Sequence, residues 1–301
     1  MRTIIIGFAI ILIALSFAPG SFANTISFNP TQVGIGARPL ALGKAYVALA
    51  DDASAIFVNP AGIASFTNLK AISMYSTLIS DENYLVLGGT YPFNFGKVGL
   101  GYINVASPNI PIYEFIGGIP TLVGYTNYSG GTLLFSYARE LNDKVLLGGS
   151  LKIFNQGFTG GGATYEATRG SGLDADLGVK YIHSDWLSLG LAAQNLIPMS
   201  MGGKFTWASG TEESIPAIFK AGLALDIFGP QGIRKTDGFK LSLLFDYDYV
   251  LTGNNTTHLG LEFRPAPVLA IRLGSDNSNL AMGLGYEYAG FTFDYAYRIL
   301  P

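Results

Sequence analysis

The chain contains 301 residues, of which 49% are hydrophobic and only 13% are Asp, Glu, Lys or Arg, while 39 glycines, 20 Phe and 17 Tyr take the place of charge. Soluble domains carry about 25% charged residues, so much of the surface of this protein does not face water. The formal net charge of −3 argues against a nucleic-acid partner, because phosphate binding requires clustered Lys and Arg. Past residue 23 no stretch reaches the roughly 18–20 apolar residues of a spanning helix, which leaves a transmembrane β-barrel as the leading class.

Residues 1–23 have the three parts of a secretory signal peptide. Arg2 supplies the positive start, residues 4–15 form an apolar core, and residues 21–23 form a small-x-small cleavage site. A retained membrane anchor is the alternative, but the apolar core is short for one. We therefore expect export, with cleavage after Ala23.

Residues 24–66 differ from the rest of the chain and predict a small helical hatch. Residues 39–50 are rich in Ala and Leu and open with a proline, which favours a short buried helix. Asp51 and Asp52 are expected to cap a second helical turn over residues 53–57, which an Asn-Pro pair then stops. A helix that is apolar on almost every side needs an enclosing partner, and the interior of a wide barrel offers one.

From residue 67 to residue 301 the dominant sequence period is two, which is typical of β-strands. In residues 240–249 one face carries Leu241, Leu243, Phe245, Tyr247 and Tyr249, and the other carries Lys240, Ser242, Leu244, Asp246 and Asp248. A soluble β-sandwich also alternates, but its outer face is densely charged, whereas the second face here is mostly Gly, Ala and Ser. We therefore predict an all-β transmembrane antiparallel barrel whose apolar face meets lipid and whose polar face lines a lumen.

Thirteen segments show this pattern, which predicts a barrel of about 13–14 strands. They span residues 69–79, 84–92, 97–107, 130–140, 144–155, 172–182, 186–196, 215–227, 238–250, 257–264, 267–273, 279–288 and 290–299. Single-chain bacterial barrels have an even number of strands, so either one strand escapes the pattern or the chain lacks its final strand. Long links at residues 108–129, 156–171 and 197–214 alternate with tight turns, as in barrels with longer outer loops and short periplasmic turns.

Three runs in the predicted hatch resemble a known signature. They are Gly36-Ala37-Arg38, then residues 45–55 (Ala-Tyr-Val-Ala-Leu-Ala-Asp-Asp-Ala-Ser-Ala), then Asn59-Pro60-Ala61-Gly62. Their order and spacing resemble the N-terminal signature of FadL/PorV-type outer-membrane proteins, closest to PorV and PorQ. The resemblance extends more loosely over residues 194–196 and 294–297, and it implies a barrel of about fourteen strands with an N-terminal hatch. Such proteins continue past the last of these motifs into one more strand, whereas this chain stops at Pro301.

The polar and small residues of the hatch are its candidate functional residues. They are Gly36, Ala37, Arg38, Asp51, Asp52, Asn59, Pro60 and Gly62. A buried charge needs a partner, so wall ions such as Lys220, Asp246 or Glu262 are expected to pair with the hatch. Such pairs either gate a passage by changing partners or only hold the hatch to the wall.

The link at residues 108–126 is more apolar than an outer loop normally is. Its candidate ligand-binding residues are Ile110, Ile112, Phe115, Ile116, Ile119 and Leu122. Exposed apolar patches mark binding surfaces. We therefore expect either a landing site for a hydrophobic molecule, at the barrel mouth and against the hatch, or a cover for apolar surface.

The sequence offers little for catalysis or for a metal site. It contains no cysteine, and its two histidines, His183 and His258, have no serine elbow or second catalytic motif beside them. The glycine-rich link at residues 156–171 lacks the Lys-Ser/Thr that would follow a phosphate-binding loop. We expect a protein that is not an enzyme and that holds no metal and no cofactor.

The leading interpretation is a barrel of the Gram-negative outer membrane that binds or passes small hydrophobic molecules. The alternative is a non-transporting barrel, resembling PorV, that docks secretion or surface-assembly partners. Outer-membrane lipid is an expected partner in both cases. A small hydrophobic ligand is expected in the first case and secretion or envelope proteins in the second.

Overall fold

The computed structural model describes residues 33–78, 82–162, 165, 168–251, 253–277 and 279–299. The predicted signal peptide, residues 1–23, and residues 24–32 of the predicted hatch lie outside the described residues. Within the described ranges, none of the helices is both long and apolar enough to cross a membrane.

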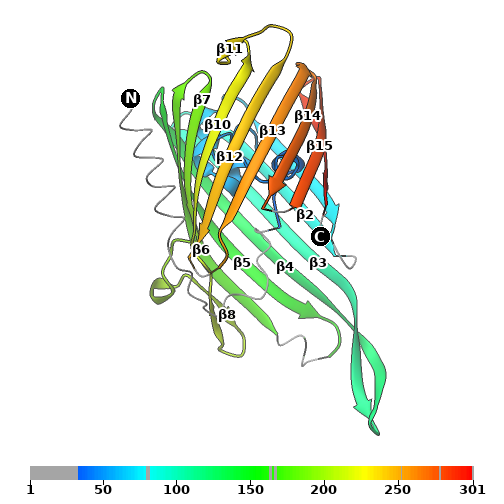
Figure 1. The fold of residues 1–301 in the computed structure, drawn as a ribbon. Helices are drawn as coiled ribbons and strands as arrows, with labels where there is room; N and C mark the ends of the chain where they lie inside the picture. Colours follow the sequence, from blue (N-terminus) through cyan, green and yellow to red (C-terminus); the bar gives the residue numbers. More distant parts are fainter. Residues whose placement is uncertain are drawn as a thin grey trace.

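One antiparallel sheet curls around the N-terminal segment and gives an all-β, barrel-like fold (Figure 1). Thirteen strands follow one another across it, which confirms the predicted count. They are β1 (Lys70–Thr77), β2 (Asn83–Phe93), β3 (Gly96–Ile116), β4 (Ile119–Asn142), β5 (Val145–Thr159), β6 (Arg169–Ser184), β7 (Leu187–Gln194), β10 (Ile218–Gly229), β12 (Lys240–Val250), β13 (Thr256–Ala266), β14 (Leu269–Asp276), β15 (Asn279–Tyr288) and β16 (Phe291–Arg298). In the part of the chain that the structure describes, no ladder joins β1 to β16, so the sheet has two edges.

Three short strands lie off this path: β8 (Lys204–Trp207), β9 (Glu212–Ser214) and β11 (Arg234–Lys235). Strand β8 pairs with β9 and with the first residues of β6, and β11 pairs with the end of β10. The sequence predicts only loop over residues 197–214, and this is wrong in detail. The β8–β9 hairpin lies in this link, and its strands are too short to show a clear period-two alternation in the sequence. It adds no strand to the wall.

Among the early strands the long connections and the tight turns lie at opposite ends of the sheet, as predicted, whereas the link between β10 and β12, residues 230–239, is long but lies at the end with the tight turns. Turns of two residues join β2 to β3, β4 to β5 and β6 to β7, and the longer links after β5 and β7 lie at the other end, which we name the loop rim. The link predicted at residues 108–126 is not a loop. It is a paired extension of β3 and β4, here named the protruding hairpin, which closes at Gly117 and Gly118 and projects away from the barrel (Figure 1).

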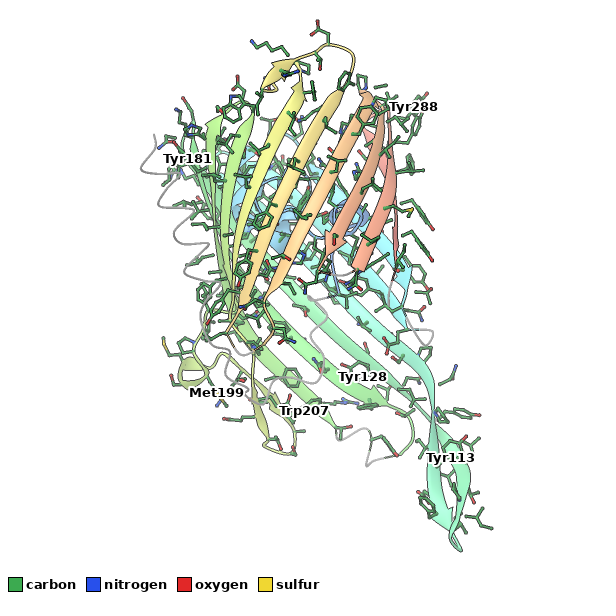
Figure 2. All side chains as sticks on the ribbon, viewed as in Figure 1. Tyr113, Tyr128, Tyr181, Met199, Trp207 and Tyr288 are labelled. Carbon is green, nitrogen blue, oxygen red and sulfur yellow. The ribbon has the colours of Figure 1, made fainter. Side chains whose placement is uncertain are left out.

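Side chains project from both faces of the wall strands (Figure 2). The outer faces are apolar as predicted, whereas the inner face is polar in strands such as β12 and β13 but apolar in β2 and β3, where Tyr84, Val86, Ile103 and Val105 are buried in the core. In β12, Leu243 is exposed on the outer face, whereas Ser242 and Asp246 are buried on the inner face. Tyr247 departs from this pattern because it is only 8% exposed on the outer face. Every wall strand exposes at least one large outward side chain, for example Tyr75, Leu87, Leu100, Phe135, Leu151, Leu177, Leu191, Phe219, Leu243, Leu259, Leu273, Leu284 and Tyr295.

The hatch contains less helix than predicted. Helix α2 covers only Ala37–Ala41, α3 covers Ala55–Val58, and a 3₁₀ helix, η2, covers Pro60–Ser65. The predicted helix over residues 39–50 is therefore wrong beyond residue 41. Gly43 (φ 61°) and Lys44 (φ 68°) adopt left-handed backbone angles, and a left-handed residue ends a helix.

The hydrophobic core lies between the hatch and the inner face of the wall. Leu42, Tyr46, Ile56 and Ile63 from the hatch are fully buried. They pack in one cluster with inward side chains of β2 to β5 and β12, namely Tyr84, Val86, Ile103, Val105, Leu134, Ala138, Leu146 and Leu244. The hatch therefore lies inside the barrel and fills the cross-section where it packs, instead of covering one end of the barrel.

The outward position of Leu243 can be tested by substitution. Leu243→Lys should lower the free energy of unfolding in vesicles by about 2–4 kcal/mol, because a charge on the lipid face of a barrel near mid-membrane is costly. Leu243→Phe, which stays apolar, is the matched control and should have little effect. Urea titration of the refolded proteins measures both, and equal stability of the two variants would contradict the outward placement.

Candidate functional site

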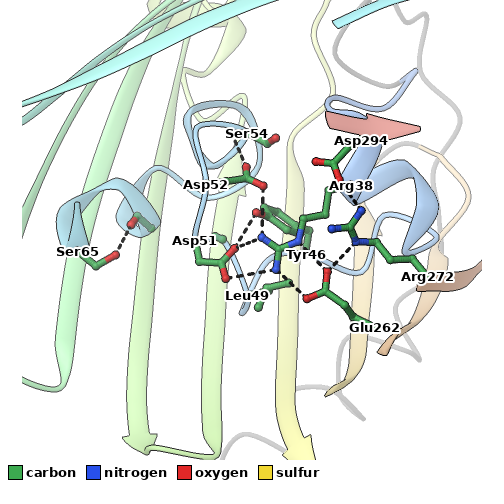
Figure 3. A network of polar contacts seen from close by, with 12 residues as sticks. Arg38, Tyr46, Leu49, Asp51, Asp52, Ser54, Ser65, Glu262, Arg272 and Asp294 are labelled. Carbon is green, nitrogen blue, oxygen red and sulfur yellow. Dashed lines mark hydrogen bonds and ion pairs between the residues drawn. The ribbon is translucent and has the colours of Figure 1, made fainter. Parts of the chain in front are cut away.

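Arg38, in α2, is the centre of the contacts between the hatch and the wall (Figure 3). Its guanidinium binds Glu262 of β13 through two bonds, Nε to Oε2 at 2.9 Å and Nη2 to Oε1 at 3.1 Å. It also donates to Asp51 at 2.6 Å and lies over the ring of Tyr46, 5.7 Å from its centroid. Tyr46 in turn donates its hydroxyl hydrogen to Asp51 at 3.0 Å. One buried cation thus ties two parts of the hatch to one wall strand.

Glu262 also accepts hydrogen bonds from wall residues. Arg272 of β14 donates Nε to it at 2.7 Å, and Arg264 of its own strand donates Nε at 3.1 Å. Arg272 extends the network to Asp294 of β16 through a bond of 2.6 Å. Because Glu262 accepts from three cations, removal of Arg38 would leave this carboxylate paired, while removal of Glu262 would leave Arg38 with the hatch carboxylates alone.

A second carboxylate, Asp246 of β12, binds the hatch backbone directly. Its Oδ2 accepts hydrogen bonds from the N–H groups of Tyr46 and Val47 at 2.5 and 2.7 Å. These two residues lie in the stretch where a helix was predicted, so the wall carboxylate takes the place of helical carbonyl acceptors. This arrangement is an independent reason why the helix is short.

Carbonyl groups of the hatch receive donors from other wall strands. Lys180 of β6 donates to the carbonyl of Leu49, and Gln194 of β7 donates to that of Phe57 at 3.0 Å. His258 of β13 binds the carbonyl of Gly43 through Nδ1 at 2.8 Å. A carbonyl only accepts, so this nitrogen carries the hydrogen.

Asn59 joins the hatch segments to each other and to the wall. Its side chain donates to the carbonyls of Val47 at 2.9 Å and Val179 at 3.2 Å, and its Oδ1 accepts from Ala61 N at 3.2 Å to cap η2. The Asn59-Pro60 pair, which was expected to stop the second helical turn, also begins a 3₁₀ helix that precedes β1. Asn59 is fully buried.

Glycines let the wall approach the hatch backbone closely. A Cβ atom placed on any of six inward-facing glycines would lie only 2.0–2.9 Å from a hatch atom. These six form three cross-strand pairs, Gly148 with Gly178, Gly190 with Gly222, and Gly260 with Gly274. The polar face that appears glycine-rich in the sequence is thus the surface on which the hatch sits.

Lys44 forms a further tether between hatch and wall near the loop rim. Its Nζ lies 3.0 Å from Asp276 of β14. Loss of water around the half-buried ammonium holds the pKa of Lys44 below its usual value, although the ion pair with Asp276 opposes this. The loss of water around the ammonium therefore has a larger effect on this pKa than the attraction of Asp276.

The structure brings most of the predicted hatch residues together. Arg38, Asp51 and Asp52 meet in one ion cluster, because Asp52 Oδ2 lies 3.4 Å from Arg38 Nη1. Gly36 precedes Ala37 at the start of α2, and Pro60 and Gly62 lie in η2. Of the three wall ions expected to bind the hatch, Asp246 and Glu262 do so, whereas Lys220 binds Asp248 on the neighbouring strand.

The predicted ligand-binding residues of the protruding hairpin do not lie against the hatch. Ile112 is buried at the root of the hairpin and Ile110 is half-buried. Phe115, Ile116 and Ile119 are exposed at the tip. Leu122 is also exposed, and Figure 2 shows Tyr113 of the same hairpin well outside the barrel. The expectation of a segment over the mouth is wrong, because β3 and β4 stay paired, across two bulges, as far as Ile116 and Ile119 and carry the segment outward.

Sequence reasoning missed Lys180, Gln194 and Arg272. Each is buried on the inner face of its strand. The sequence signal that could have found them was their position in the period-two pattern, which places them on the inner face. A long polar side chain there needs a partner inside the lumen. Among the described residues, no three His, Cys, Asp or Glu side chains lie together in a way that could hold a metal ion.

A groove of about 350 Å³ lies on the outer face near the loop rim. Ile153 of β5 and Leu173 of β6 supply apolar surface, and Lys204 and Thr206 of β8 line the other side. Asn195 anchors the segment that carries β8, because its Nδ2 donates to the carbonyl of Pro216 at 2.8 Å. The groove thus combines an apolar wall with a polar edge.

The close fit between wall and hatch predicts a specific substitution effect. Gly274→Ala should destabilise the protein by about 1–3 kcal/mol, because the added Cβ would lie 2.0 Å from Gly43 N of the hatch. Gly89→Ala is the matched control, since its nearest neighbour would be 3.9 Å away. Urea unfolding of both variants measures the difference, and an unchanged midpoint for Gly274→Ala would show that the hatch does not sit against β14.

Comparison with known proteins identifies the fold. No protein-family model matches the sequence, and no curated protein matches it. The structure is similar to the Pseudomonas putida toluene transporter TodX, with a TM-score of 0.56, 12% identity, and 90% of this chain and 91% of that chain covered. It is also similar to the CymD monoaromatic hydrocarbon channel (TM-score 0.54, 14% identity, 90% and 94% covered) and to a Pseudomonas aeruginosa FadL homologue (TM-score 0.51, 12% identity, 93% and 90% covered). The chain therefore shares the fold of FadL-type barrels.

Proposed function

We propose that this protein is an outer-membrane barrel that passes small hydrophobic molecules. The outward apolar side chains on all thirteen wall strands suit a lipid environment. Two of the compared structures are named as a toluene transporter and a monoaromatic hydrocarbon channel. The proposal includes export by residues 1–23 with cleavage after Ala23, and it assigns the protein no reaction.

The observation that carries the proposal is the way in which the hatch is attached. It fills the interior, so a route through the barrel requires the hatch to move. It is held by side-chain hydrogen bonds and ion pairs such as Arg38 with Glu262, and no hatch segment described by the structure joins the sheet. Such contacts can exchange partners without breaking the wall ladders. A ligand would open the route only if it binds the displaced hatch more tightly than the resting one.

The groove beside β8 suits the capture of a small apolar molecule. It is an open groove of about 350 Å³, so a molecule in it would keep one side in contact with the surrounding medium. Its apolar side is formed by outward residues of the wall, Ile153 and Leu173. A molecule dissolved in lipid would therefore reach it without crossing water.

The docking role expected for a barrel resembling PorV or PorQ receives no support from the compared structures. All three barrels named above are titled as a transporter, a channel or a FadL homologue. A ligand-binding role for Ile110, Ile112, Phe115, Ile116, Ile119 and Leu122 stays a prediction, with Ile112 the least accessible of the six.

A reversible crosslink between hatch and wall tests the proposal. The chain has no cysteine, so Lys44→Cys with Asp276→Cys can be bridged selectively by a bis-methanethiosulfonate reagent. We expect parent protein to speed the uptake of radiolabelled toluene into vesicles whose outer leaflet contains lipopolysaccharide. We expect the bridged variant to fall to the rate of empty vesicles and to recover after reduction.

Single-cysteine variants treated with the same reagent control for modification alone. Parent protein that takes up toluene no faster than empty vesicles would contradict the proposed function. Full uptake by the bridged variant would instead contradict a route that requires movement of the hatch.

A further inference from the structure

The protruding hairpin is longer than membrane crossing requires. Strands β3 and β4 contain 21 and 24 residues, whereas about 9–11 residues of a tilted strand cross a bilayer. Beyond Ser107, β3 pairs only with β4, up to Ile116 opposite Ile119. The hairpin continues the direction of the wall strands past the loop rim and away from the barrel (Figure 1).

The hairpin has the composition of a buried segment but is exposed. Residues 108–126 include a single charged residue, Glu114. Phe115 is 77% exposed, Ile119 68% and Ile116 57%, and all three lie next to the Gly117-Gly118 turn. Large exposed apolar surfaces are rare on proteins unless they contact another molecule or a membrane.

Apolar side chains occupy both faces of the tip. Residues directly opposite one another in the ladder share a face. Phe115 lies opposite Pro120, and Ile116 lies opposite Ile119 on the other face. A partner protein that covered one face would leave the other exposed. A lipid phase, in contrast, can surround both faces at once.

Aromatic residues lie behind the tip, and Tyr113 lies at the depth that a bilayer interface requires. Tyr113 is three residues from Ile116, a distance of about 10 Å along a strand. Tyr113 and Tyr125 are both more than half exposed. Interfacial elements insert about 5–10 Å, so the ring of Tyr113 would lie at the headgroups, where Tyr is enriched, while Tyr125, which pairs with Pro111, would lie farther from the tip.

The root of the hairpin is fixed to the barrel. Thr126 donates its hydroxyl hydrogen toward the carbonyls of Gly160 at 3.1 Å and Thr159 at 3.3 Å. Ile112 is 6% exposed and lies against Gly161. The loop after β5 therefore supports the root, and the tip is presented at a set distance from the rim.

We propose that the tip of the protruding hairpin inserts into the interface of a second lipid bilayer that faces the loop rim. The hairpin continues the wall strands beyond the loop rim (Figure 1), so its tip would reach an opposing bilayer and not the one around the barrel. Without Lys or Arg in residues 108–126, its binding depends on apolar insertion and not on anionic lipid. This interaction does not depend on the proposed passage of hydrophobic molecules.

Flotation tests the inference with protein in nanodiscs and vesicles of phosphatidylcholine. Parent protein should float with the vesicles, and the Phe115→Asp/Ile119→Asp double variant should lose most of this binding. Met201→Asp is the matched control, because Met201 is also 77% exposed and lies in a link at the same rim. It should float like the parent. Failure of the parent to float, equal loss in the control, or a requirement for anionic lipid would overturn the inference.

A fluorescent label provides a second measurement that needs no disruptive substitution. An environment-sensitive dye on Ile116→Cys should shift to shorter wavelength when phosphatidylcholine vesicles are added, while the same dye on Asn109→Cys, at the root, should not. A shifted spectrum before any vesicles are added would show that another protein copy or the bilayer around the barrel already covers the tip, and would contradict insertion into a second bilayer.

Discussion

Residues 42–50 of the hatch form no regular helix or strand. Their peptide N–H and C=O groups therefore lack the hydrogen bonds of secondary structure, and leaving them unpaired inside the barrel would cost free energy. The wall supplies the missing partners. Asp246 accepts the N–H groups of Tyr46 and Val47, and Lys180 donates to the carbonyl of Leu49. Because these contacts involve three different stretches of sequence, the irregular hatch is stable only inside this wall.

The same constraint explains the composition of the inner face. Where the hatch backbone touches the wall, the wall residue is glycine, as in the pair Gly260 and Gly274. Where the hatch presents a polar group, the wall residue is an ion or an amide, as with Glu262 and Gln194. The outer face follows a different rule, since apolar residues such as Leu243 are exposed there. The chain contains few charged residues because the outer face is apolar and because much of the inner face is glycine in contact with the hatch.

Period-two alternation was enough to predict the thirteen wall strands and the inward position of Asp246 and Glu262, because a barrel strand has two chemically distinct faces. The end of α2 at Ala41 has one signal in the sequence, the left-handed Gly43, but the irregular course of the residues that follow also depends on a wall carboxylate about 200 positions away in the sequence, which no local pattern reveals. The protruding hairpin was hidden for another reason. It is apolar on both faces and contains three prolines between residues 108 and 120, and proline counts against a strand.

The buried pair of Arg38 and Glu262 couples the hatch to the wall. A double-mutant cycle with Arg38→Ala, Glu262→Ala and the combined variant measures this coupling from the free energy of unfolding. Each single variant leaves buried charge without this partner, so the combined loss should be smaller than the sum of the two by about 1–3 kcal/mol. Losses that add to within about 0.5 kcal/mol would show that the two residues act independently and would contradict the account.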